Sequence, residues 1–335
     1  MHIGTQMSGG KFAELGDPYL KQLAQLGVRN VCIDPEGNPH DWTDDILARH
    51  IDRLDRAGLS LDMVQLPLAS RPISENRSKN IMLGKSPERD REIDSICRLI
   101  ERLAVLGVPA VKYNMNIIGI PRIEPAIGRG GARNSTWRLA DATDGDTLTE
   151  AGEVSAEEFW SRIDYFLERV VPVAESAKVR MACHPHDPPT PEGYRGVTRV
   201  LATVDGLKKF VQMHESPYHG LNFCQGTIAE GMVNPREEIG DAIRWFGERN
   251  KIFNVHFRNI RGGLNDFQET FPDDGDMDMV ASFKLYHELG YRHMIMPDHV
   301  PGIDGNAPWE TAFAYCFGYI NALFQATGIP QDGAA

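Results

Sequence analysis

The chain has 335 residues, of which 41% are hydrophobic, and a formal net charge of −12. This length and apolar content suffice for one large core, and a barrel of alternating strands and helices with insertions commonly reaches this size. The acidic balance, without any basic block, argues against nucleic acid and an anionic membrane surface as partners. A small anionic substrate is still compatible with it, because a bound metal ion and local arginines can reverse the field inside one pocket.

The five cysteines, spread from Cys32 to Cys316, do not form an even disulfide framework and favour a reducing cytoplasm. The N-terminal MHIGTQMSGG has neither a basic nor an apolar signal region, and no apolar run approaches about 18 residues. We therefore expect a cytoplasmic protein with no membrane segment. Assembly into a homo-oligomer is expected as well.

Strand-like and helix-like patterns alternate along the whole chain, which is typical of parallel βα units. The predicted strands are His2–Thr5, Asn30–Ile33, Ser60–Gln65, Ala110–Asn114, Val179–His184, Gly220–Cys224, Ile252–His256 and His293–Pro297. The clearest amphipathic helices are Asp44–Ala57, Ser86–Leu106, Ala156–Ala177, Pro235–Arg249 and Met277–Leu289, and Trp309–Ala326 would close the set. The pattern predicts the α/β class, as one (β/α)₈ TIM barrel domain over residues 1–335.

A long segment after the fourth strand, residues 115–152, is rich in Gly, Pro, Arg, Asn and Thr. A connection of this length is uncommon unless it is a lid, a binding loop or disordered. We interpret it as an active-site insertion that carries Arg122, Arg129, Arg133 and Arg138. The alternative is an oligomer contact or a mobile loop.

Four potential metal ligands, His184, Cys224, His256 and Asp298, each follow a short apolar run that reads as a strand. Because side chains alternate along a strand, the residues two positions earlier share a face with each ligand. Those residues are Ala182, Asn222, Asn254 and Met296. A single histidine at a strand end is more often structural, and a lone cysteine is usually a small core residue. Four such residues in phase at the C-terminal ends of parallel strands favour a metal site instead.

This donor set suits a borderline divalent ion such as Mn²⁺, Fe²⁺ or Zn²⁺, with Mn²⁺ favoured, and is too soft to prefer Mg²⁺ or Ca²⁺. His186 and His299 lie beside the ligands, so either could exchange protons with a metal-bound substrate. Arg258, two residues past His256, could clamp a substrate carboxylate or could be a surface arginine. The run Asp273, Asp274, Asp276 and Asp278 could be a solvated turn or could hold substrate hydroxyls.

At these loops the chain resembles the mannonate dehydratase family, metal-dependent sugar-acid lyases with a xylose-isomerase-like barrel. The matching stretches include His184-Pro185, Phe223-Cys224, Pro297-Asp298-His299 and the segment Gly275–Met279. The resemblance implies a metal held by His184, Cys224, His256 and Asp298, and an acid/base role for His299. Its other matching stretches place Tyr113, Asn114, Asp187, Asn259 and Asp276 as substrate-binding residues.

The chain departs from the family pattern at three positions. His186 stands where the family has an acidic residue, Met296 where it has an arginine, and Trp309 where it usually has a tyrosine. We expect a hydro-lyase that dehydrates D-mannonate or a close sugar acid to a 2-keto-3-deoxy sugar acid, with His299, His186 and Arg258 as catalytic residues. The alternatives are a metal-dependent sugar isomerase or epimerase on the same barrel, or a non-catalytic sugar-binding protein.

Overall fold

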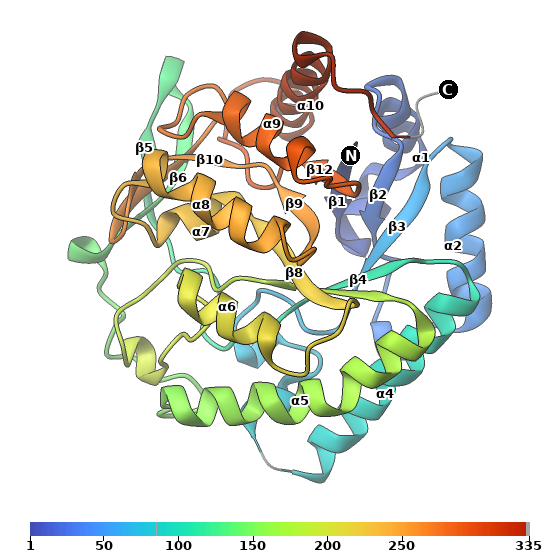
Figure 1. The fold of residues 1–335 in the computed structure, drawn as a ribbon, viewed down its shortest axis with the longest axis vertical. Helices are drawn as coiled ribbons and strands as arrows, with labels where there is room; N and C mark the ends of the chain where they lie inside the picture. Colours follow the sequence, from blue (N-terminus) through green and yellow to red (C-terminus); the bar gives the residue numbers. More distant parts are fainter. Residues whose placement is uncertain (85, 333–335) are drawn as a thin grey trace.

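In the computed structural model, which describes residues 1–84 and 86–332, eight parallel strands close into a barrel surrounded by helices (Figure 1). The strands are β1 (His2–Met7), β2 (Asn30–Ile33), β3 (Ser60–Gln65), β4 (Ala110–Asn114), β7 (Arg180–His184), β8 (His219–Cys224), β9 (Ile252–His256) and β12 (Met294–Met296). Their order around the barrel is β1-β12-β9-β8-β7-β4-β3-β2, so consecutive barrel strands are neighbours. The predicted fold class is confirmed, and β2, β3, β4 and β9 have the predicted bounds.

The helices lie outside the barrel and bury one apolar face against it (Figure 1). They are α1 (Gly9–Gln25), α2 (Asp44–Arg56), α3 (Lys79–Leu83), α4 (Pro87–Val105), α5 (Ala156–Ala177), α6 (Val204–Gln212), α7 (Gln225–Glu230), α8 (Pro235–Gly247), α9 (Met279–Glu288) and α10 (Pro308–Thr327). Short 3₁₀ turns occupy Pro39–Asp41, Ile73–Glu75, Arg129–Gly131, Leu139–Asp141 and Tyr194–Gly196. Sequence periodicity did not single out α1, because Gly16, at φ 63°, and Pro18 interrupt its helical pattern.

Strand alternation divides the buried side chains into two cores. Residues inside the barrel form a small cluster of Cys32, Met63, Ala110, Ala182, Phe253, Met294 and Met296. Outward residues join the large core between strands and helices, as Tyr113 does by contacting Phe166 on α5 with ring centroids 5.6 Å apart. Ala182 and Met296 therefore point into the barrel, as deduced from the sequence. The residues two positions later, His184 and Asp298, lie at its C-terminal end.

The segment 115–152 is not irregular throughout, because it contributes two strands to a second sheet. These are β5 (Ile123–Ile127) and β6 (Arg133–Arg138), which join the hairpin of β10 (Asn259–Gly263) and β11 (Asp266–Thr270). The sheet is antiparallel, in the order β10-β11-β6-β5. Since β10 begins three residues after β9 ends, this sheet stands over the C-terminal end of the barrel, and Figure 1 shows it to one side of the strands.

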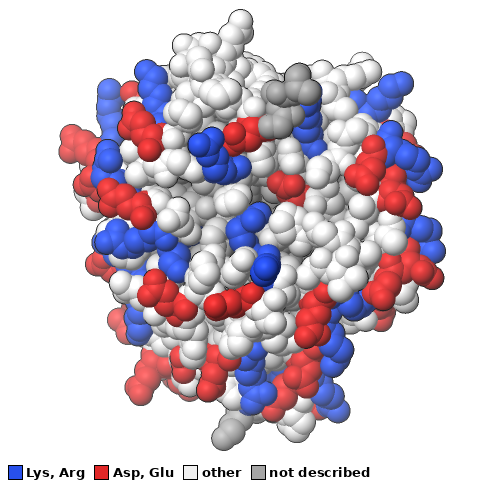
Figure 2. Space-filling view, turned by 45° about the vertical axis from the view of Figure 1, so that its right-hand side comes forward, with Lys and Arg blue, Asp and Glu red and all other residues white. Residues whose placement is uncertain are grey.

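The surface carries both signs of charge. On the face shown in Figure 2, acidic and basic side chains alternate and neither sign gathers into an extended patch. In the part of the chain that the structure describes, no helix is both long and apolar enough to cross a membrane.

Candidate active site

The four predicted ligands converge at the C-terminal end of the barrel. One donor atom from each of His184, Cys224, His256 and Asp298 lies within 4.8 Å of all the others, and all four residues are buried. The Asp298 carboxylate is 3.2 Å from His256 Nδ1 and 3.7 Å from Cys224 Sγ. The Cys224 thiol donates its hydrogen to Asp298, and donor atoms this close suit a shared cation once that hydrogen is lost.

Local structure orients each ligand. His184 Nδ1 donates to the carbonyl oxygen of Pro185 at 2.7 Å, so Nε2 is the nitrogen that is free to bind a metal. Asn222, two residues before Cys224 on the same strand face, donates to His256 Nε2 at 3.1 Å. Cys224 caps α7, and its Sγ accepts from the backbone N–H of Thr227 at 3.4 Å. Burial raises the pKa of the Cys224 thiol, opposed by Arg258 and by the hydrogen bond from Thr227, so a bound metal ion would have to displace the thiol proton.

These residues fit a divalent transition metal ion. Burial first, and then the neighbouring His256 and Lys112, hold the pKa of His184 well below its ordinary value. Burial also lowers the pKa of His256 to about 4, partly opposed by Asp298. Both rings are therefore neutral at physiological pH, the form that binds a metal. Two imidazoles, one thiol and one carboxylate make a donor set that a hard ion such as Mg²⁺ would not select.

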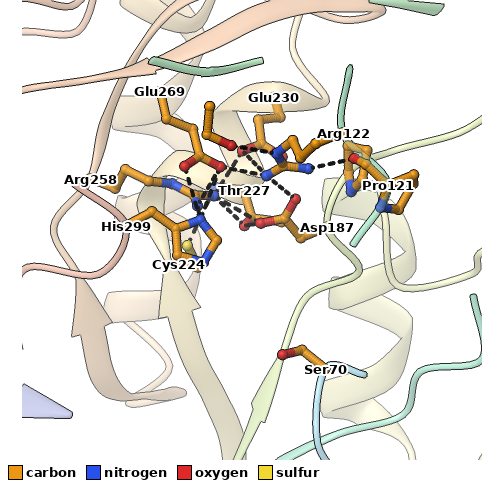
Figure 3. Close-up of polar contacts among 12 residues, drawn as sticks. Ser70, Pro121, Arg122, Asp187, Cys224, Thr227, Glu230, Arg258, Glu269 and His299 are labelled. Atoms are coloured by element: carbon orange, nitrogen blue, oxygen red, sulfur yellow. Dashed lines mark hydrogen bonds and ion pairs between the residues drawn. The ribbon is translucent and has the colours of Figure 1, made fainter. Parts of the chain in front are cut away.

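A buried network of charged side chains adjoins the metal ligands (Figure 3). Arg258, at its centre, bonds Asp187, Thr227, Glu230 and Glu269 at 2.7 to 3.1 Å. It also lies 3.4 Å from the Asp298 carboxylate. Arg122 contributes a second guanidinium, which bonds Asp187 and Glu269 from the other side.

Charge balance within this network sets the protonation of its carboxyl groups. Burial opposes ionisation of Glu269, but Arg258, His299 and Arg122 outweigh it and lower the pKa to about 2. The same two arginines overcome burial at Asp187 and lower its pKa. Burial and the neighbouring Asp187 raise the pKa of Glu230 well above its ordinary value. Two guanidinium groups thus face two carboxylates, while Glu230 keeps its proton.

His299 connects the charged network to the open part of the site. Its Nδ1 is 2.9 Å from Glu269 Oε2, and its side chain is 38% exposed. Nδ1 lies between Glu269, which only accepts, and Arg258 Nη1, which only donates and is 2.6 Å away, so Nε2 is the ring nitrogen left for a substrate. Burial by itself would lower the pKa of His299, but Asp298 and Glu269 raise it.

The contacts of Arg258 do not favour its predicted role of a carboxylate clamp. Its side chain is 0% exposed, and both terminal nitrogens are already bonded to protein groups. The spacing from His256 indicated the direction of Arg258 but not the three acidic partners around it, so the clamp stays a prediction that these contacts do not favour. Arg258 is instead a structural cation that holds the network together.

His186, which was predicted to be catalytic, is buried and does not line the pocket beside His299. Its ring is buried, Nε2 is 2.7 Å from the carbonyl oxygen of Met115, and Nδ1 accepts from the backbone N–H of Leu201. Burial and Arg199 lower the pKa of His186 to about 3. A ring with both nitrogens held by the backbone is not positioned to exchange protons with a substrate.

Three predicted substrate-binding residues lie away from the metal ligands in this structure. Tyr113 is fully buried and packs outward against α5. The Asn259 side chain bonds the backbone of Pro272 and Met277 within the turn before α9. Asp276 is exposed and accepts from the backbone N–H of Gly262. None of these side chains reaches the metal ligands.

The other two predicted residues lie close to the site. Asp187 belongs to the buried network, where it is saturated by Arg122, Arg258 and Thr227. Asn114 pairs in register with His184 on the inward face, and its buried Oδ1 has no hydrogen-bond partner among the described residues. Asn114 therefore keeps its candidate role.

Of the four arginines in the insertion, only Arg122 reaches the site. Arg129, Arg133 and Arg138 form surface ion pairs with Asp273, Asp304 and Asp266 respectively. The insertion acts mainly through its sheet, because β6 pairs with β11 and β11 carries Glu269. Glu269 was not among the sequence candidates, since its position follows from a pairing that sequence does not reveal.

A pocket of about 380 Å³ opens beside Asp298 and His299. Its wall also includes Gln6, Asp34, Gln65 and Lys112 from β1 to β4, and Trp309 and Phe313 from α10. Lys112 Nζ donates to Gln6 Oε1 at 2.6 Å, and Gln6 Nε2 donates to Asp298 at 3.0 Å. The sequence candidates did not include these polar residues. Strand alternation could have found Gln6, Asp34 and Lys112, because each continues the inward-facing positions of its strand.

The departures from the family pattern occupy different places. Met296 lies inside the barrel with its sulfur 3.8 Å from Asn254 Nδ2, and Trp309 lines the pocket. Trp309 also packs against Phe313, with ring centroids 4.3 Å apart. The pocket wall at α10 is consequently aromatic and apolar.

The fold is a closed (β/α)₈ barrel, and a candidate metal cluster and a polar pocket lie at the C-terminal ends of its strands. These features are typical of barrel enzymes that act on small polar substrates. The family model described as D-mannonate dehydratase (UxuA) matches residues 138–330. The chain belongs to this family, and the resemblance seen in the strand-end motifs is confirmed. Dehydratases of this kind are carbon–oxygen lyases, as expected.

Two curated relatives come from Halalkalibacterium halodurans. Mannonate dehydratase 2 is 28% identical over 92% of this chain and 94% of its own length. Mannonate dehydratase 1 is 31% identical over 68% of this chain and 70% of its own length. A crystal structure of mannonate dehydratase from Streptococcus suis serotype 2 superposes with a TM-score of 0.83 at 24% identity, covering 100% of this chain and 97% of that one.

Proposed function

We propose that the protein dehydrates D-mannonate, or a close sugar acid, to the 2-keto-3-deoxy acid. The observation that carries the proposal is the position of His299, which follows a candidate metal ligand, is held by Glu269 and faces a pocket lined by Lys112. A cavity of about 380 Å³ lies within the range of roughly 300 to 1,000 Å³ that is usual for small-molecule sites.

We propose Mn²⁺ as the ion held by His184, Cys224, His256 and Asp298, while Fe²⁺ and Zn²⁺ match the same donors. When bound, the ion supplies a Lewis acid that stabilises negative charge on a substrate oxygen. Metal analysis of the purified protein distinguishes the three.

The side chains of the pocket account for binding and proton transfer. Lys112, which is 8% exposed, pairs with the substrate carboxylate in place of the saturated Arg258. Glu269 fixes the ring of His299, so that Nε2 takes the proton from the carbon next to the carboxylate. Trp309 and Phe313 exclude water from one side of the pocket.

To test this proposal, metal-loaded protein is incubated with a panel of aldonic acids, uronic acids and neutral ketoses. We expect loss of one water from an acid, seen by mass spectrometry, and formation of a 2-keto-3-deoxy product. Protein treated with a chelator is the control. Conversion of a neutral ketose without loss of water would reject the dehydratase and favour an isomerase. The expected homo-oligomer and the cytoplasmic location stay predictions, and light scattering checks the first.

A further inference from the structure

Asp34 is a carboxyl group in the pocket wall that the proposed function has not used. It follows β2 in the inward phase of Asn30 and Cys32, and it lines the same pocket as His299. Its Oδ1 accepts from the backbone N–H of Gln65 at 2.8 Å. In barrel order β1 alone separates β2 from β12, which His299 closely follows, so the two side chains belong to neighbouring parts of the rim.

The other charged groups of this pocket have protein partners or a role already proposed, as Lys112 has toward the substrate carboxylate. Lys11 pairs with Glu14, Arg71 with Glu75, and Lys112 donates to Gln6. Asp298 is a candidate metal ligand. Within residues 1–84 and 86–332, Asp34 forms no ion pair with a lysine or arginine, unlike Asp187 and Glu269.

The surroundings of Asp34 favour its protonated form. Burial raises the pKa of Asp34 to about 7, opposed by the hydrogen bond from Gln65 and by Lys112. Cys32 on β2 and Lys112 on β4 interact with Asp34 electrostatically. A general acid is most effective when its pKa lies near the working pH.

The elimination of water needs a second proton transfer, and we propose that Asp34 is the catalytic acid that protonates the departing hydroxyl group. The inference rests on the proposed dehydration. His299 accepts the proton from C2, and the electrons of that C–H bond form the C2=C3 double bond. The C3–O bond breaks, its electron pair stays on oxygen, and the oxygen takes the Asp34 proton and leaves as water. The enol then tautomerises to the 2-keto-3-deoxy acid, His299 releases the C2 proton to solvent, and solvent returns a proton to Asp34.

The experiment uses full-length, metal-loaded Asp34→Asn and Asp34→Glu variants, with Asp41→Asn as a control on the exposed surface near β2. Each is assayed on the acid that the wild type dehydrates and on the same acid with fluorine in place of the hydroxyl at C3. Fluoride leaves with less need of a proton. Metal content and thermal unfolding are measured in parallel.

We expect Asp34→Asn to keep its metal and lose about 10²- to 10⁴-fold in kcat on the hydroxyl substrate, with little change in KM. It should lose far less on the fluorinated substrate. The decline of wild-type kcat above about pH 7 should be absent in Asp34→Asn and retained in Asp34→Glu. Equal losses on both substrates, or full activity of Asp34→Asn, would overturn the role of Asp34. A wild type that dehydrates no acid would instead reject the proposed function.

Discussion

At the C-terminal end of β12, two consecutive residues have different tasks. Asp298 faces His256 and Cys224 in the candidate metal cluster, whereas His299 contacts Glu269 and remains partly exposed. The division follows from backbone direction, since adjacent side chains point to different sides. Substitutions at these positions should therefore separate metal binding from proton transfer.

Cys224→Ala should remove the metal. The wild type should hold roughly one divalent ion per chain, and loss of a direct ligand should weaken binding more than the 10- to 100-fold typical of outer partners. Metal analysis after dialysis gives the result. Cys97→Ala is the matched control, because Cys97 lies on α4 away from the cluster. Equal metal content in both variants would reject the site.

His299→Asn should keep the metal but lose about 10²- to 10⁴-fold in turnover, since a positioned acid/base contributes that much. Steady-state kinetics and metal analysis of the same sample provide the check. His287→Asn on α9 serves as the control. Wild-type turnover in metal-loaded His299→Asn would return His299 to a structural role.

Arg258→Met should destabilise the fold by about 3 to 5 kcal/mol, because it leaves buried carboxylates without their central cation. Denaturant unfolding measures the change. Arg129→Met is matched to it and should cost under about 1 kcal/mol, since the Arg129 pair with Asp273 is exposed. Similar losses in the two variants would contradict the structural role of Arg258.

At the scale of elements, the small sheet is the part of the fold that positions the charged network. Pairing of β11 with β6 fixes Glu269, which in turn bonds Arg258, Arg122 and His299. The tight turn between β10 and β11 depends on Gly262, at φ 86°, where an added Cβ would lie 2.2 Å from the carbonyl oxygen of Asp266. The sheet thus supports the site without contributing a ligand to the cluster of His184, Cys224, His256 and Asp298.

Gly262→Ala should therefore lower both stability and turnover. The matched control is Gly58→Ala, which has a similar φ of 77° but no atom within 4 Å of the added Cβ. The control should show only the backbone cost of roughly 1 to 2 kcal/mol. Thermal unfolding and kinetics separate the two, and unchanged turnover in Gly262→Ala would show that the hairpin does not position Glu269.

At the scale of the whole molecule, acid should destabilise the protein through buried histidines. Burial lowers the pKa of His219 to about 4, below the usual 6.5, so the folded state binds a proton less readily than the unfolded state. The resulting stability is fully present above pH 6.5 and is lost as the pH falls from 6.5 to about 4.

Between pH 6.5 and about 4, the free energy of unfolding should fall by about 3 kcal/mol through His219, at 1.36 kcal/mol per pKa unit. His219→Gln should flatten the fall in unfolding free energy between pH 6.5 and 4, measured by urea titration at each pH. His287→Gln, at a partly exposed position, should leave the fall unchanged. An identical pH dependence in wild type and His219→Gln would count against the assignment.

The sequence by itself determined the barrel, the strand bounds to within a few residues and the inward phase of the four candidate ligands. These follow from the two-residue period of strands and from helix periodicity, which are local properties of the chain. Extended to β1, β2 and β4, the same phase would also have placed Gln6, Asp34 and Lys112 inside the pocket.

Only the tertiary structure decided which charged groups meet. Arg258 is buried in the charged network because Glu230 and Glu269 approach it from α7 and β11. His186 is held by the carbonyl oxygen of Met115, away from the pocket. The insertion forms β5 and β6 because β6 pairs with β11, in a hairpin more than 100 residues further along the chain. Such contacts join segments that are distant in sequence, so no local periodicity encodes them.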